Sequence, residues 1–185
     1  MPKLIVLFYG AESPASTLAE AAADGAKGVR FTEVDVRAGS SHEPTTGRRH
    51  RSLDSSERLK EYDGVVIAAP AAGEIPAELD ALLGELEHTE PVGVFTNTVF
   101  AVLGGENTTL LGRVAGLGGI IVSEPASLDD PEARARATGK RVAKVIEWVR
   151  HALSHEHAHE RQQHHDDSHH EQHRHDHDDR TAPDR

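Results

Sequence analysis

Histidine is the residue type with the clearest chemical potential in this chain, because eleven histidines fall within residues 151–185. Neutral imidazole is a common ligand of divalent transition metals, and closely spaced histidines need little loop closure to chelate one ion. The spacing predicts multi-site binding of an ion such as Zn or Ni. The alternatives are a solvated extension with incidental metal affinity and a pH-responsive segment. The candidate ligands are His155, His157, His159, His164, His165, His169, His170, His173, His175 and His177.

A second group of residues, near the N-terminus, could bind phosphate. Ser13-Pro14 is typical of the start of a helix, whose free N–H groups and positive dipole end suit an anion. Neither GxGxxG nor GxxxxGK[ST] is present, so the dinucleotide fingerprint and the Walker loop are excluded. The alternative is that Ser13 only caps the helix. The candidates are Gly10, Ala11, Glu12, Ser13, Ser16 and Thr17.

Two further short segments follow apolar runs and are candidates for the same site. One follows the run over residues 65–69, and the other follows the run over residues 91–95. In a parallel sheet, ligands bind beyond the carboxyl ends of the strands. The residues are Pro70, Ala71, Ala72 and Gly73 in the first segment and Thr96, Asn97 and Thr98 in the second.

The elements that must position these loops alternate regularly along the chain. Strands are predicted at residues 4–9, 29–36, 65–69, 91–96 and 120–122, each followed by a helical pattern. Such alternation implies a parallel sheet that is covered on both faces. Apolar residues become scarce after Leu153, so we expect one folded domain over residues 1–153 and a disordered tail over residues 154–185.

Composition excludes several classes of function. The formal net charge of -11 opposes attraction to nucleic acids and to anionic membranes. Because the chain contains no cysteine, it has no disulfide, thiolate metal site, iron–sulfur cluster or cysteine nucleophile. The apolar run over residues 4–9 is too short for the core of a signal peptide, so we expect a cytoplasmic protein.

Three segments resemble the flavodoxin-like NAD(P)H:quinone oxidoreductases of the tryptophan-repressor-binding protein type. Residues 4–19, LIVLFYGAESPASTLA, are similar to that family's first strand, phosphate loop and helix. Residues 62–83, YDGVVIAAPAAGEIPAELDALL, resemble its third strand, the loop beside the flavin ring and the next helix. Residues 91–109, PVGVFTNTVFAVLGGENTT, resemble its fourth strand and the following loop. The resemblance implies an α/β, flavodoxin-like three-layer sandwich with a five-stranded parallel sheet of order 2-1-3-4-5.

The resemblance also implies a function: FMN held by the three loops, hydride transfer from NAD(P)H to a quinone, and a homo-oligomer. The departures from the family pattern fall within the loops. Gly10 stands where the family usually has Ser or Thr, Glu12 adds a carboxylate, and residues 71–74 replace Thr-Arg-Phe-Gly. Residues 99–103 are apolar and are expected in a loop, as flavin contacts or as a subunit interface.

Two interpretations therefore stay open at this point. One is an FMN-dependent NAD(P)H oxidoreductase with a variant site. The other is a non-catalytic flavodoxin-fold module that has lost FMN and uses its histidine-rich tail for metal storage or delivery. No residue stands out as a general acid or base, and hydride transfer through a flavin requires none.

Overall fold

The computed structural model describes residues 1–9, 14–39, 53, 56–69, 75–89, 93–105 and 107–175, with backbone only from residue 156 onward. The described residues divide into two compact units, Met1–Glu147 and Trp148–Arg185. The first unit contains the whole sheet. None of the helices in the described part of the chain is long and apolar enough to cross a membrane.

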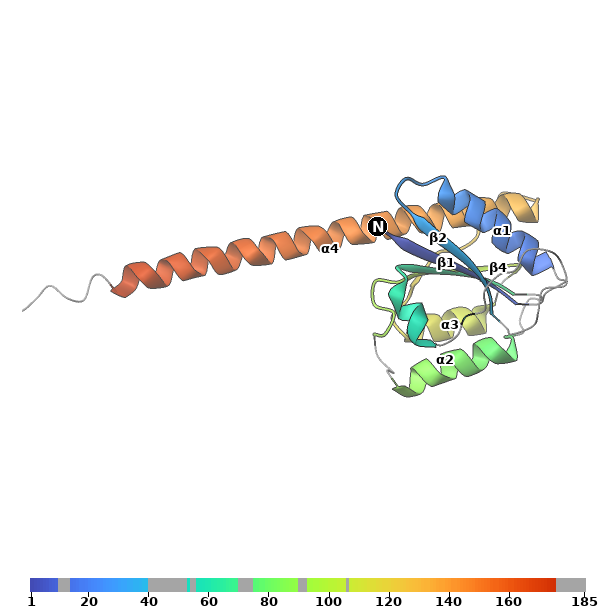
Figure 1. Ribbon diagram of the computed structural model, residues 1–185, viewed down its shortest axis with the longest axis horizontal. Helices are drawn as coiled ribbons and strands as arrows, with labels where there is room; N and C mark the ends of the chain where they lie inside the picture. Colours follow the sequence, from blue (N-terminus) through green and yellow to red (C-terminus); the bar gives the residue numbers. More distant parts are fainter. Residues whose placement is uncertain are drawn as a thin grey trace, which may run out of the picture. The chain divides into compact units, whose positions relative to one another are not determined.

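A five-stranded parallel sheet forms the centre of the first unit (Figure 1). Its order is β2-β1-β3-β4-β5, and every neighbouring pair is parallel. The predicted fold class and strand order are therefore confirmed. The strands are β1 (Lys3–Phe8), β2 (Glu33–Ala38), β3 (Gly64–Ala68), β4 (Val99–Leu103) and β5 (Ile120–Ile121).

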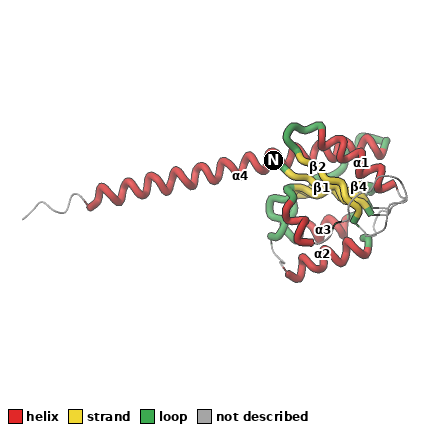
Figure 2. The backbone as a smooth tube through the Cα atoms, in the orientation of Figure 1, coloured by secondary structure: helices red, strands yellow, loops and turns green. Residues whose placement is uncertain are grey.

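Helices cover both faces of this sheet, which gives the three layers seen in Figure 2. The start of α4 and the whole of α1 lie on one face, while α2 and α3 lie on the other (Figure 1). Strands β3 and β4 are buried at every position, because both of their faces are covered. The helices are α1 (Pro14–Lys27), the 3-10 helix η1 (Ser56–Glu61), α2 (Ala77–Thr89), α3 (Thr108–Gly116) and α4 (Pro131–His175).

Alternate residues of the strands supply the core beneath α2 and α3. Ile5, Ile67 and Phe100 belong to this cluster, together with the apolar stripes of the two helices. The rings of Phe95 and Phe100 pack at a centroid distance of 4.7 Å. Burial of these large side chains provides the main driving force for closing α2 and α3 onto the sheet.

On the opposite face, α1 and α4 approach so closely that no side chain fits between them at two glycines. A Cβ atom on Gly139 would lie 2.0 Å from the carbonyl oxygen of Ala22, and one on Gly25 would lie 1.9 Å from that of Arg136. The buried surface of α1 consists almost entirely of alanine, which permits this approach. The distance between α1 and α4 is therefore set by contacts between their backbones.

Strand β4 lies later in the chain than the sequence predicted. Residues 93–97 form a turn instead of a strand, with Gly93 at φ 76 and Asn97 at φ 70. Glycine and asparagine are the residues that tolerate this left-handed backbone best. The strand is built from residues 99–103, so the prediction that this segment is a loop is wrong. Its contacts with flavin or with a second subunit stay predictions.

Helix α4 continues through the predicted start of the tail at residue 154 and ends at His175. Its first part packs in the first unit, where Ala135, Val142 and Ile146 are buried. The remainder belongs to the second unit. Composition predicted disorder for this second part, and its disorder in the metal-free protein stays a prediction.

Candidate functional site

The carboxyl ends of β1, β3 and β4 meet at one edge of the sheet. Phe8 is in register with Ala68, and Ala68 is in register with Leu103. The segments that follow these three residues therefore begin side by side. This edge is where ligands bind in open α/β sheets, and the switch in strand order falls between β1 and β3.

Two of the three predicted loops follow directly from this edge. Gly10, Ala11, Glu12, Ser13, Pro70, Ala71, Ala72 and Gly73 all lie outside the described residues. Ser16 and Thr17 are described in the first turn of α1, where Ser16 is partly buried and Thr17 is exposed. Their role in phosphate binding stays a prediction.

The third predicted group is not brought to this edge. Thr96, Asn97 and Thr98 precede β4, whose first residue, Val99, is in register with the first residue of β3. The Val99 N–H donates to the Asp63 carbonyl at 2.9 Å. The three residues consequently lie at the amino edge of the sheet, across the strands from the other candidates. Their assignment to a shared site rested on the wrong position of β4.

The segment that does follow β4 is short and rich in glycine. Gly104 has φ 94 and Gly105 has φ 136, and a Cβ atom on Gly104 would lie 3.0 Å from the Ala69 carbonyl oxygen. The chain leaving β4 therefore contacts the chain leaving β3. Asn107 ends the segment, and its Oδ1 accepts a hydrogen bond of 3.0 Å from the Leu110 N–H, which caps α3.

A cavity of about 460 Å³ opens beside this segment, at the carboxyl ends of β4 and β5. Its apolar wall includes Val102 and Leu111. Its polar lining residues are Thr108, Ser123, Glu124 and Arg134. An apolar pocket with a few convergent polar groups is the usual form of a small-molecule site.

Glu124 and Arg134 give this cavity its electrostatic character. Burial raises the pKa of the Glu124 carboxyl, while the positive charge of Arg134 and a hydrogen bond from the Gly104 backbone oppose that rise. Arg134 donates from Nη1 to the Leu128 carbonyl at 3.3 Å. Its Nε–H is buried and has no hydrogen-bond partner among the described residues. Arg134 thus brings a positive charge to the lining of the cavity.

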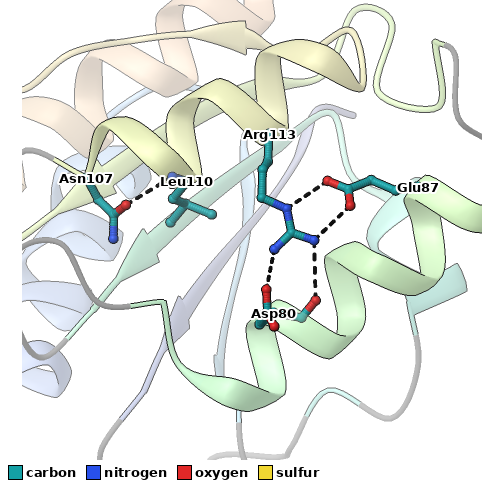
Figure 3. A network of polar contacts seen from close by, with 5 residues as sticks. All are labelled: Asp80, Glu87, Asn107, Leu110 and Arg113. Carbon is teal, nitrogen blue, oxygen red and sulfur yellow. Dashed lines mark hydrogen bonds and ion pairs between the residues drawn. The ribbon is translucent and has the colours of Figure 1, made fainter.

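Ion pairs of Arg113 hold α3 in place (Figure 3), and the first turn of that helix lines the cavity. Arg113 binds Glu87 with two hydrogen bonds, at 2.7 Å from Nε and 2.8 Å from Nη2, and also pairs with Asp80. The hydrogen bond from Arg113 lowers the pKa of Glu87. These contacts hold α3 against α2 and so position the first turn of α3 at the cavity.

Sequence reasoning missed the whole of this cavity. Glu124 and Arg134 are ten positions apart, on the two sides of the connection between β5 and α4. One feature of the sequence indicates part of this site: Ser123 and Glu124 follow the carboxyl end of a predicted strand, where ligand-binding groups are expected.

Of the predicted metal ligands, His155 alone has a described side chain, and it is exposed on α4. Its Nε2 lies 3.1 Å from Nε2 of His151, a residue absent from the predicted set. The side chains of His157, His159, His164, His165, His169, His170, His173 and His175 lie outside the described part, and so does all of His177. Among described side chains, no group of three or more suits a metal ion.

The strand order, the covered faces and the ligand edge define a flavodoxin-like α/β domain. Comparison with solved structures supports this class: a flavone reductase matches with a TM-score of 0.59 and 15% identity, over 81% of this chain and 65% of that one. A short-chain flavodoxin associated with a non-canonical PDU bacterial microcompartment matches with a TM-score of 0.52 and 15% identity, over 80% and 99%. No protein-family profile matches the chain.

Comparison with curated proteins defines the family. The NAD(P)H dehydrogenase (quinone) of Acidovorax ebreus (strain TPSY) is 30% identical over 146 residues, which span 69% of this chain and 72% of that protein. The protein of the same name from Chromohalobacter salexigens is 30% identical over 135 residues, 60% and 63% of the two chains. The chain therefore belongs to the NAD(P)H dehydrogenase (quinone) family, as its sequence resemblance predicted.

Proposed function

We propose that this protein is an FMN-dependent oxidoreductase that uses NAD(P)H to reduce a quinone. The observation that carries the proposal is the 30% identity to a curated NAD(P)H dehydrogenase (quinone), across 72% of that protein. The flavodoxin-like sheet order supports it independently, because it provides the ligand edge that such an enzyme needs. When bound, FMN supplies the chemistry, by accepting hydride from the nicotinamide and passing it to the quinone.

The described residues at this edge fit the polar rim of a flavin ring. Arg134 offers a guanidinium group, Thr108 and Ser123 offer hydroxyls, and the remaining wall is largely apolar. A planar ring with polar edges needs this combination of groups. In our proposal Arg134 holds the polar edge of the ring, and Ser16 with Thr17 supports the phosphate end near Gly10–Ser13.

The rest of the predicted site belongs to the same proposal. Pro70–Gly73 would border the ring from the end of β3, since Ala69 already contacts Gly104. Assembly into a homo-oligomer and a cytoplasmic location are also retained as proposals.

The direct experiment is a titration of the purified protein with FMN, followed by an assay of NAD(P)H-dependent quinone reduction. Arg134→Met should weaken FMN binding by about tenfold or more, because a hydrogen bond from a charged group contributes about 1.5–3 kcal/mol. Arg136→Met is the matched control, since Arg136 is exposed on the same helix and does not line the cavity. A colourless protein that gains no flavin absorbance and reduces no quinone would refute the proposal.

A second function is favoured by the displacement of Thr96–Thr98 from the ligand edge. Thr96–Thr98, whose polar side chains match the family's third loop, precede β4 and lie at the amino edge of the sheet. The segment that follows β4 at the ligand edge consists of residues 104–107 alone. This favours a non-catalytic flavodoxin-fold module that has lost FMN and stores or delivers Zn or Ni through its tail. The same titration separates the two functions.

A further inference from the structure

Two histidines near the start of the second unit are held in the geometry of a metal chelate. His151 and His155 are both exposed on α4, and their Nε2 atoms are 3.1 Å apart. Their rings meet edge to face with centroids 4.5 Å apart. Residues four apart lie on the same face of a helix, so the backbone itself brings the two rings together.

We propose that His151 and His155 chelate one divalent transition-metal ion through their Nε2 atoms. Metal–imidazole bonds of about 2.1 Å would meet at an angle of roughly 95° across this separation. That angle falls between the octahedral and tetrahedral values that Ni²⁺ and Zn²⁺ prefer. The inference does not depend on the flavin or on the proposed enzyme activity.

The two rings now share a hydrogen bond, in which one Nε2 carries the proton and the other accepts it. When an ion binds, the Nε2 proton of the donating ring moves through water to Nδ1 of the same ring. Both neutral rings then carry their hydrogen on Nδ1, and each Nε2 presents a lone pair to the metal. Two imidazoles do not complete the coordination of an ion, and the described side chains include no group of three or more that could hold a metal. Water fills these positions, and binding is correspondingly moderate.

The helix makes this pair different from the rest of the histidine-rich segment. In a flexible chain, histidines at many spacings chelate about equally well, because loop closure depends only weakly on length. On a helix, a spacing of four brings two rings onto one face, while a spacing of seven separates them by about 10 Å along the axis. The proposal therefore predicts a strict dependence on spacing.

Trp148 provides a fluorescence signal for metal binding at this pair. Trp148 is the single tryptophan, it is 67% exposed, and it precedes His151 by three residues within the same unit. On the helix it lies on the face that carries His151 and His155. Ni²⁺ bound to the pair would lie close enough to quench the indole fluorescence.

The experiment uses the full chain in which the nine histidines after His155 are replaced by Gln, so that this pair is isolated. Ni²⁺ titration should quench Trp148, and Zn²⁺ should compete. The double substitution H151Q/H155Q should abolish saturable quenching. His88→Gln, on α2, is the control and should leave the titration unchanged.

A composition-preserving swap, H155A/A158H, tests the geometry in the same background. It places the second imidazole seven positions after His151, and it should weaken Ni²⁺ binding by about tenfold or more, to the level of H155Q alone. Circular dichroism establishes that each variant remains helical. Equal Ni²⁺ affinity of the swapped and unswapped proteins, or retained binding in H151Q/H155Q, would overturn the proposal.

Discussion

The contact between α1 and α4 gives a sharp prediction about a single methyl group. Gly139→Ala would place a Cβ atom 2.0 Å from the Ala22 carbonyl oxygen, where about 3 Å is the closest approach that real Cβ atoms make. Because the obstacle is backbone, no side-chain rotation can relieve it, and the helices must separate by about 1 Å. Overpacking of this kind costs about 1–3 kcal/mol.

Helix propensity acts in the opposite direction, since alanine is favoured over glycine inside a helix by about 1 kcal/mol. Gly112→Ala isolates that effect: Gly112 lies in α3, and a Cβ atom there would meet nothing within 4 Å. The same substitution should therefore stabilise the protein at residue 112 and destabilise it at residue 139. A net loss of up to about 2 kcal/mol is expected for Gly139→Ala.

Urea unfolding followed by circular dichroism is the assay. We expect a lower midpoint for Gly139→Ala and a higher one for Gly112→Ala, with unchanged slopes. If Gly139→Ala raised the midpoint as much as Gly112→Ala does, the argument that backbone contact sets the helix distance would be refuted.

Three further predictions concern ionisable groups. Because the hydrogen bond from Arg113 lowers the pKa of Glu87, the ionised Glu87 stabilises the protein above the ordinary glutamate pKa, and this contribution is lost as the pH falls through the lowered pKa. Glu87→Gln should therefore cost under about 1 kcal/mol at neutral pH and progressively less in acid, measured by urea midpoints. Burial first, and then the Asp35 hydrogen bond, raise the pKa of Tyr62 to about 12, so absorbance titration should show it protonated at pH 10.5, and Asp35→Asn should lower that pKa. The raised pKa of Glu124 means that stability falls as the pH rises through its titration; Glu124→Gln should stabilise the protein at neutral pH, and melting curves showing destabilisation would contradict this.

The sequence was sufficient for the parts of the fold that depend on local patterns. Strands β1 and β3 are unbroken apolar runs, and burial on both faces explains that composition. The same rule offers two apolar runs for β4, one before and one after Thr96–Thr98, and it does not decide between them. The outcome depended on Gly93 and Asn97 entering the left-handed region, which the pattern of apolar residues does not reveal.

The cavity could not be predicted because its parts come from separate elements. Arg134 reaches it from α4, Thr108 from the first turn of α3 and Glu124 from the segment between β5 and α4. None of these residues belongs to a motif, and only the packed helices bring them together. The pair of His151 and His155 was missed for a simpler reason, since a spacing of four has meaning only once the helix is known to cross residue 154.

The close contact of α1 and α4 also limits which substitutions this fold can accept. A larger residue at position 25 or 139 meets backbone, so no compensating change in a neighbouring side chain can accommodate it. Relatives that keep this helix spacing should have glycine at both positions, whereas position 112 is free to vary. A relative with larger residues at both positions should have a displaced α4, and because Arg134 lies on that helix, its ligand preference should change as well.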